Sequence, residues 1–372
     1  MQIRFLNQTG IQYPMKNQKF FSDSLLLWNN TKNDRQMPWK GEKNPYRIWV
    51  SEIILQQTRV QQGIIYYNRF IHEFPDIKTL ATASEKKVYK LWEGLGYYSR
   101  CKNLMTSAKF IYEKLDGNFP EKYEDILSLK GVGNYTASAI VSFAFNEPYA
   151  VLDGNVFRVL SRFFGIEIPV NTTEGKKFYA PLAQSLLDKK NPALYNQAIM
   201  DFGAVICKPA LPLCLQCSLQ KKCVAFLENK VSVLPINNTV NKQKKRFFNY
   251  LVIEYKRKLY LNKRVEKDIW QNLYEFILIE TKSLQSEKEI LQNEQFLSLL
   301  EGNEFKVKSF SERLSQKLTH QFITGRFIHL EIKRPLTNNK YFTVNVNQLK
   351  ALPFPKFIAS YLAWKNVPLS SI

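Results

Sequence analysis

The sequence predicts a multidomain chain in which an all-α domain is followed by a smaller α+β domain. Apolar residues recur at helical spacing, with few strand signals, over residues 21–228. A polar, basic stretch with little periodicity follows at 229–245 and is typical of a linker. Alternation of apolar and polar residues then marks strands within 246–372. Residues 1–20 precede these patterns as an N-terminal extension.

The composition indicates a globular protein with a polyanionic partner. The chain has 372 residues, of which 45% are hydrophobic, and 53 Lys and Arg exceed 32 Asp and Glu to give a net charge of +21. That charge favours nucleic acid, although a Lys-, Asn- and Ile-rich composition set by the source genome explains part of it. No apolar run reaches membrane-spanning length, and the start of the chain lacks the apolar core of a signal peptide. We therefore expect a cytoplasmic, nucleoid-associated bacterial protein with no membrane partner.

The helices of the first domain follow one another through short loops. Residues 20–30 begin the first helix, with Ser22 or Asp23 as the candidate N-cap. Residues 48–71 repeat apolar positions at intervals of three, four and seven, and they predict one continuous helix. The same spacing predicts further helices at 84–115, 123–145, 154–165, 176–187 and 191–207. The first of these segments is broken at "GLG", and the second contains a tight turn at "GVG".

The second domain combines strand and helix patterns. The segment 248–264 predicts two strands around a basic turn, and alternation predicts further strands at 320–334 and 340–349. Helical spacing recurs at 286–302 and 354–365.

Glu52 is the first candidate for chemistry. On its helix it is flanked by Trp49 and Ile53, so it does not lie on a clean solvent face. A carboxylate among apolar neighbours is either paired with another group or has a raised pKa and can donate a proton. The simpler alternative is a rim residue that bonds to a nearby loop.

Asp153 is the second candidate. It follows a short apolar run and directly precedes a helix, which is the position of an N-cap. The alternative is a carboxylate that points into a cleft beside another carboxylate. Glu52 and Asp153 with separated pKa values would suit cleavage of a glycosidic bond, because one can donate a proton while the other stabilises an oxocarbenium-like sugar.

The turn Gly131-Val132-Gly133 joins two predicted helices. Its glycines permit positive φ and close backbone approach, and free N–H groups at the start of the second helix can hold a phosphate. Any tight corner between helices can contain the same pattern, so the turn alone does not establish DNA binding.

Four of the five cysteines form the pattern C-x6-C-x2-C-x5-C at Cys207, Cys214, Cys217 and Cys223. Four thiolates so close in sequence predict a metal site. The residue types do not choose between Zn²⁺ and a [4Fe–4S] cluster, since both accept four sulfurs. Cys101 stands apart and is expected to be a small buried apolar residue.

Together these motifs resemble those of a known family. The chain is similar to MutY-type adenine DNA glycosylases of the helix-hairpin-helix, iron–sulfur superfamily. The matching runs lie in family order over residues 37–223: "PWKGEKNPYRIWVSEIILQQTRV", "LWEGLGYYSR", "LKGVGNYTASAI", "LDGNVFRVLSR", "NQAIMDFGAVIC" and the cysteine loop.

The resemblance implies roles for the two carboxylates. Glu52 matches the family's catalytic acid, which protonates adenine at N7. Asp153 matches the carboxylate that stabilises the charged sugar once the base has left. Tyr135 and Asn155 match residues that support this pair.

The resemblance also implies a DNA surface and a cofactor. Gln57, Thr58, Leu95 and Tyr97 match residues that read the mispaired strand or wedge beside it. The four clustered cysteines match the ligands of a [4Fe–4S] cluster.

Tyr135 separates the family from its strand-cleaving relatives. Endonuclease III-like enzymes have a lysine at this point of the hairpin, and its amine attacks the sugar as a Schiff-base nucleophile. A phenol cannot form a Schiff base, so we expect base removal without efficient strand cleavage.

The second domain resembles, less strongly, the Nudix-like domain of the same family. Leu318-Thr319-His320 lies where the family has a Phe-Ser-His-type loop that contacts 8-oxoguanine, and Leu318 and Thr319 depart from that pattern. The acidic metal-binding helix of true Nudix hydrolases is missing from the sequence, so nucleotide hydrolysis is not expected. The simpler interpretation of His320 is a polar residue on a strand.

These observations predict a monomeric base-excision repair enzyme whose partner is double-stranded DNA. It is expected to hydrolyse the N-glycosidic bond of adenine opposite 8-oxoguanine, or opposite guanine. The alternatives are an endonuclease III-like glycosylase with lyase activity and a catalytically silent iron–sulfur DNA-binding protein.

Overall fold

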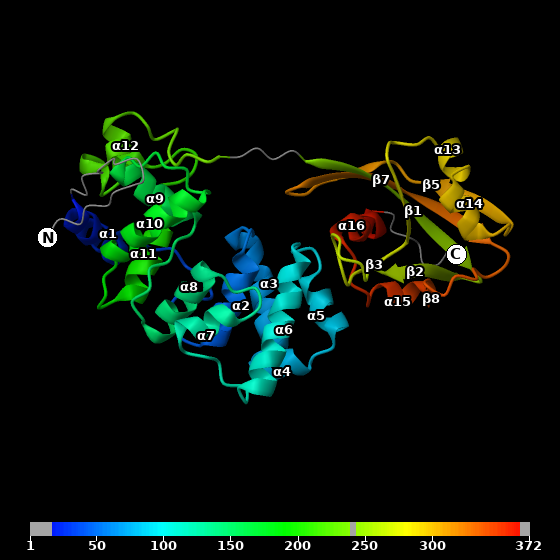
Figure 1. Cartoon of the computed structure of the whole chain (residues 1–372), viewed down its shortest axis with the longest axis horizontal. Coiled ribbons are helices and arrows are strands. Elements are labelled where there is room, and N and C mark those ends of the chain that lie inside the picture. The colour runs from blue at the N-terminus through cyan, green and yellow to red at the C-terminus, as the bar shows by residue number, and fades with distance from the viewer. Residues whose placement is uncertain (1–16, 239–242, 365–372) are drawn as a thin grey trace. The chain divides into compact units, whose positions relative to one another are not determined.

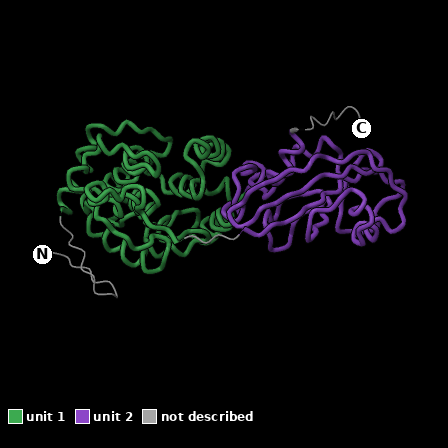
Figure 2. The backbone as a smooth tube through the Cα atoms, turned by 90° about the horizontal axis from the view of Figure 1, so that it is seen from above, with its two compact units in different colours: residues 1–82, 103–239 green, residues 83–102, 240–372 purple. Residues whose placement is uncertain are grey.

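The computed structural model describes residues 17–238 and 243–364. The chain divides into two compact units, Met1–Thr82 with Asn103–Thr239 and Ala83–Lys102 with Val240–Ile372 (Figures 1 and 2). The first unit is helical and the second is built on a mixed sheet, so the predicted fold class is confirmed. The compact units differ from the expected domains at residues 83–102, which hydrogen bond with the C-terminal part of the chain: Asn272 donates to the hydroxyl of Tyr89 at 2.9 Å.

The first unit consists of helices joined by short loops. Helix α6 (Tyr98–Lys114) runs through the boundary at residues 102 and 103. The other helices of this unit are α1 (Gln18–Lys32), α2 (Pro45–Leu55), α3 (Val60–Glu73), α4 (Ile77–Thr82), α7 (Tyr123–Ser128), α8 (Asn134–Phe145), α9 (Gly154–Phe164), α10 (Thr173–Leu186), α11 (Pro192–Val205) and α12 (Val224–Leu227), with 3-10 turns η1 (Cys214–Gln216) and η2 (Gln220–Lys222).

Helix α1 shows how the sequence pattern builds the core of this unit. Its buried residues Phe21, Leu25 and Trp28 recur at spacings of four and three, so they lie on one face. Phe21 packs on Phe163, and Trp28 packs edge-on against Phe202, with ring centroids 4.9 Å apart in both pairs. This face joins α1 to α9 and α11.

Two details of the predicted helices are wrong. Ser22 does not cap α1, which begins at Gln18; its hydroxyl instead donates to the carbonyl of Leu186 at 3.0 Å. The helix predicted over 48–71 is two helices, α2 and α3, because the chain turns at Gln57, where φ is +58°. The apolar spacing continues through this turn, so it gave no sign of the break.

The second unit contains α5 (Glu85–Trp92) and an eight-stranded sheet. Strand β1 (Lys244–Tyr255) lies at its centre and runs parallel to β7 (Gln321–Ile332), whereas the other pairs are antiparallel. The remaining elements are β2 (Lys258–Lys263), β3 (Tyr274–Glu275), β4 (Ile277–Thr281), β5 (Phe305–Phe310), β6 (Leu314–Lys317), β8 (Phe342–Asn345), α13 (Glu287–Leu291), α14 (Glu294–Leu300), α15 (Val346–Leu349) and α16 (Lys356–Trp364).

The central strand is buried on both faces, which fits its apolar run 247–253, interrupted only at Asn249. Leu251 and Ile253 face one way and join a core with Phe296 of α14. Tyr250 faces the other way, with its ring stacked 5.3 Å from that of Phe327.

The predicted N-terminal extension and linker lie partly outside the described residues, which omit 1–16 and 239–242. Strand β1 already begins at Lys244, inside the predicted linker. Within the described ranges, no helix is long and apolar enough to cross a membrane.

Candidate active site

Glu52 lies near the C-terminal end of α2, a helix that is well defined at its start. The Asn44 side chain accepts hydrogen bonds from the N–H groups of Tyr46 and Arg47, and Pro45 occupies the first helical position. The Glu52 side chain is buried, with 5% of the residue exposed. The apolar neighbours seen in the sequence therefore do keep this carboxyl group out of water.

Helices α2 and α8 run antiparallel, and hydrogen bonds join them at both ends. At one end, Gln56 at the end of α2 donates to the hydroxyl of Thr136 near the start of α8 at 3.4 Å. At the other end, Nζ of Lys43 donates to the carbonyl of Phe143 at 3.0 Å. The pairing brings Tyr135, in the first turn of α8, to Glu52.

Tyr135 hydrogen bonds to Glu52. Burial raises the pKa of Glu52 to about 7, although the bond from Tyr135 lowers it, and the charge of Asp153 raises it further. Burial likewise holds the pKa of the Tyr135 phenol well above its usual value. The neutral carboxyl of Glu52 is thus a proton donor near neutral pH.

Asp153 is the N-cap of α9 and also lines the pocket that contains Glu52. Its Oδ1 accepts from the N–H of Val156 at 2.8 Å, and its Oδ2 accepts from the Asn155 amide at 2.6 Å. Burial raises the pKa of Asp153, while these two hydrogen bonds lower it. The predicted N-cap is therefore confirmed, and the same carboxylate also lines the pocket; its catalytic role stays a prediction.

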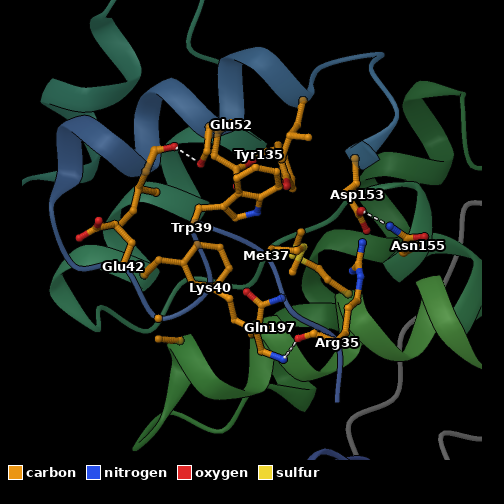
Figure 3. Close-up of a pocket in the computed structure, with 18 of the residues that line it drawn as sticks. Arg35, Met37, Trp39, Lys40, Glu42, Glu52, Tyr135, Asp153, Asn155 and Gln197 are labelled. Carbon is orange, nitrogen blue, oxygen red and sulfur yellow. Dashed lines mark hydrogen bonds between the residues drawn. The ribbon is translucent and has the colours of Figure 1, made fainter. Parts of the chain in front are cut away.

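The pocket has a volume of about 690 Å³ and lies within the first unit. Figure 3 shows Glu52 with Tyr135, and Asp153 with Asn155, around Trp39 and Met37. The predicted residues Gln57 and Thr58 also line it. A volume of this size is typical of a small-molecule site, and the two carboxyl groups bring acid–base chemistry to it.

Sequence reasoning missed one wall of this pocket. Asp201 is fully buried in α11 and accepts from Arg35 at 2.7 Å and from Gln197 at 2.9 Å. Its other oxygen lies 3.1 Å from Nζ of Lys40. This single carboxylate fixes the segment before α2, whose Trp39 faces the pocket. The signal was an Asp within the apolar run "AIMDFGAV", which required a buried cationic partner.

Arg158 links Asn155 to the cysteine loop. One terminal guanidinium nitrogen donates to Oδ1 of Asn155 at 2.8 Å and to the carbonyl of Gly203 at 2.6 Å. Its Nε donates to the carbonyl of Cys207, also at 2.6 Å. The partner of Asp153 is thereby held by a side chain that also fixes the first clustered cysteine.

The four clustered cysteines line one cavity of about 30 Å³ in the first unit. Arg162 lies beside them and donates to the sulfur of Cys207 at 3.5 Å. Four thiols around a common cavity match the donor set of a thiolate-bound metal group. In the described part of the chain, however, no three His, Cys, Asp or Glu side chains come close enough together to hold a single ion.

The residues predicted to contact DNA are distributed over both units. Gly131 has φ of +81°, where a Cβ would lie 2.7 Å from that of Asn103, so glycine is needed for this turn. Val132 is buried, whereas Gly133 is exposed before the start of α8. Leu95 is buried, with 6% exposed, so its contact with DNA stays a prediction.

In the second unit, Tyr97 and Thr319 share a hydrogen bond between their hydroxyl groups. Tyr97 is 45% exposed and has φ of +46°. His320 is exposed in the bend just before β7 and not on the strand itself, and its carbonyl accepts from the N–H of Lys244. Their roles in DNA recognition also stay predictions.

Comparison with known proteins agrees with this architecture. Residues 50–176 match the HhH-GPD superfamily of base excision DNA repair proteins, and residues 249–364 match the NUDIX domain. The adenine DNA glycosylase of Buchnera aphidicola subsp. Baizongia pistaciae is 34% identical over 343 residues, which cover 90% of this chain and 93% of that protein. The Homo sapiens adenine DNA glycosylase is 41% identical over 214 residues, 55% of this chain and 39% of the human protein.

Solved structures show the same fold for the helical part. A thermostable thymine-DNA glycosylase superposes with a TM-score of 0.53 at 29% identity, covering 57% of this chain and 98% of its own. Endonuclease III in a non-covalent DNA complex gives a TM-score of 0.50 at 17% identity, over 57% and 95% of the two chains.

The helical fold and the matching relatives thus define a DNA glycosylase of the helix-hairpin-helix class, an enzyme of base-excision repair. More narrowly, the chain belongs to the adenine DNA glycosylase family.

Proposed function

We propose that this enzyme hydrolyses the N-glycosidic bond of adenine opposite 8-oxoguanine or guanine in double-stranded DNA and leaves the strand intact. The observation that carries the proposal is the buried carboxyl group of Glu52. Its pKa is raised to about 7, it hydrogen bonds with Tyr135, and it lines the same cavity as Asp153. The proposed place of action is the bacterial cytoplasm, where the protein acts as a monomer on nucleoid DNA.

In the proposed mechanism, the neutral Glu52 carboxyl donates its proton to N7 of adenine. The C1′–N9 bond then breaks, and its electron pair leaves with the base, which departs as a neutral tautomer. The Asp153 carboxylate, held by Asn155, stabilises the oxocarbenium character of the sugar. Water adds at C1′, and its proton restores the Glu52 carboxyl.

Strand cleavage needs an amine at the sugar, and the amines that line the pocket are engaged elsewhere. Nζ of Lys40 donates to the carbonyl of Arg35 at 2.8 Å and pairs with Asp201. Nζ of Lys43 donates to the carbonyl of Phe143. Because Tyr135 occupies the position of the lyase lysine, we infer a monofunctional enzyme.

The proposed DNA contacts follow from the need to expose the base. Adenine must leave the stack to reach a buried acid. Gln57 and Thr58 at the pocket rim, with Leu95 and Tyr97 as wedge residues, would fill the gap. The turn Gly131-Val132-Gly133 would hold a phosphate through backbone N–H groups. Thr319 and His320 would contact the opposing 8-oxoguanine.

We further propose that Cys207, Cys214, Cys217 and Cys223 hold a [4Fe–4S] cluster. The supporting observation is that all four cysteines line one cavity, beside Arg162. The cluster would act as a structural clip for the loop that Arg158 joins to Asn155. Iron and sulfide analysis of purified protein tests this, and a zinc-replete protein without sulfide would contradict it.

The test of the function is a single-turnover assay on end-labelled duplexes with adenine opposite 8-oxoguanine or guanine, with and without alkali. We expect breaks only after alkali treatment. Glu52→Gln should abolish them while leaving DNA binding intact, and Glu113→Gln, which changes an exposed carboxylate on α6, is the matched control. Breaks without alkali would restore the lyase alternative. Binding without breaks would favour the silent DNA-binding protein.

A further inference from the structure

The residues that line the cavity containing Glu52 are spread along the helices that build it. Helix α2 has 11 residues and is therefore about 16 Å long. Gln57 follows its C-terminal end and Lys43 precedes its N-terminal end, yet both residues line the same cavity. The cavity thus extends along the whole of α2.

Helices α8 and α11 indicate that the cavity extends in the same direction. Tyr135 in the first turn of α8 and Asn146 just beyond its C-terminal end both line the cavity. In α11, Leu194 lies in the first turn, whereas the carbonyl of Gly203 near the other end is bonded by Arg158 beside Asn155. Figure 3 likewise shows Asp153 and Glu42 on opposite sides of the cavity.

Exposed residues lie at both ends of this cavity. The front rim, beside Asp153, includes the exposed residues Gln57 and Gly154. The rear rim is formed by Lys43, Asn146, Asn191 and Leu194, all exposed, and Leu194 is 43% exposed.

Apart from Leu194, the residues of the rear rim are polar, and hydrogen bonds hold their side chains in place. Lys43 binds the carbonyl of Phe143, and the Asn146 amide donates to the carbonyl of Lys190 at 3.4 Å. Asn191 is bonded to Asp188. Side-chain amides on both sides of this rim offer donors and acceptors to the edges of a purine.

We propose that this cavity is a channel with two mouths, and that adenine excised at Glu52 leaves through the rear mouth while the abasic strand still occupies the front. The inference rests on the proposed function, because it assumes that DNA enters beside Gln57 and Asp153. With the abasic sugar at the front rim, the rear mouth, whose residues are exposed, offers the second route to solvent. The water that adds at C1′ uses the same route in the opposite direction.

In this channel, the side chain of Leu194 at the rear mouth controls whether adenine can leave before the abasic DNA does. Replacing it with tryptophan narrows the rear mouth from the first turn of α11, without touching Glu52 or Asp153. The matched control is Leu27→Trp, because Leu27 is 64% exposed on α1 and does not line the cavity.

The experiment uses the full chain and a duplex that contains tritiated adenine opposite 8-oxoguanine. Abasic sites are counted after alkali, free adenine is separated by rapid gel filtration, and dissociation of DNA is followed by fluorescence. In the unmodified protein and in Leu27→Trp, we expect free adenine to appear as fast as abasic sites and well before DNA dissociates. In Leu194→Trp, release of adenine should lag abasic-site formation at least several-fold, with label retained on the protein–DNA complex.

Two results would overturn the channel. One is release of adenine by a folded Leu194→Trp variant as fast as by Leu27→Trp. The other needs no variant: adenine leaves the unmodified protein only when DNA does. If the unmodified protein forms no abasic sites at all, the proposed function itself fails, and that result is distinct from both.

Discussion

At the scale of single residues, Glu52 governs the pH dependence. Its pKa is raised to about 7, so the carboxyl is protonated below that pH and loses its proton above it. We expect the single-turnover excision rate to be highest below pH 7 and to fall about tenfold per unit above it, since only the neutral form donates. A pH–rate profile on pre-bound DNA measures this, and a rate that stays constant to pH 9 would contradict it.

The variant Tyr135→Phe tests whether Glu52 sets the descending limb of that pH–rate profile. The hydrogen bond from Tyr135 lowers the pKa of Glu52, so its removal should move the descending limb to higher pH. A limb that does not move would mean that another group sets it.

The residue scale also shows where sequence reasoning stopped. The two carboxyl groups and their partners could be predicted, since they lie in recognisable motifs. Asp201 and its anchoring of Arg35 and Lys40 could not, because these contacts join α11 to a loop about 160 residues earlier. Spacing within one segment carries no information about such partners.

At the scale of elements, the turn before α8 offers a paired test. Gly131→Ala places a Cβ against Asn103 at positive φ, which costs about 1–2 kcal/mol and should displace the turn. Gly133→Ala meets nothing within 4 Å and has an ordinary φ of −106°. We expect Gly131→Ala to lower both the melting temperature and DNA affinity, and Gly133→Ala to keep the melting temperature. Equal melting temperatures for the two variants would contradict the strain argument.

Arg158 tests the connection between α9 and the cysteine loop. Arg158→Lys cannot reproduce the fork that reaches Asn155, Gly203 and Cys207. Each buried acceptor left without a partner costs roughly 1–3 kcal/mol, so we expect a lower melting temperature. The excision rate should fall more than DNA affinity, because Asn155 holds Asp153. Unchanged excision in a folded variant would show that Asn155 needs no support.

The boundaries of elements were the least predictable level of the fold. Periodicity predicted most of the helices and the strands β1, β2, β7 and β8, whereas the short strands β3, β4, β5 and β6 were not predicted. The turn at Gln57 was not predicted either, because apolar positions continue from α2 into α3 with helical spacing. That turn depends on backbone conformation at one polar residue rather than on the pattern around it.

At the scale of the whole molecule, the two units have separate hydrophobic cores. Removal of the proposed cluster should therefore lower the transition of the first unit only, whose core includes Cys207, Cys217 and Cys223 at its edge. Differential scanning calorimetry before and after oxidative loss of the cluster measures this. An equal shift of all transitions would contradict independent cores, and no shift would contradict a structural cluster.

The raised pKa values of Glu52 and Asp153 have an evolutionary consequence. Desolvation disfavours the charged form of both carboxyl groups, so neutral amides in their places should be tolerated or even stabilising. Alleles that abolish excision in this way would leave a soluble, abundant protein that cellular quality control does not remove. A population could then lose adenine excision while protein levels stay normal, and surveys of protein abundance or folding would class such alleles as functional.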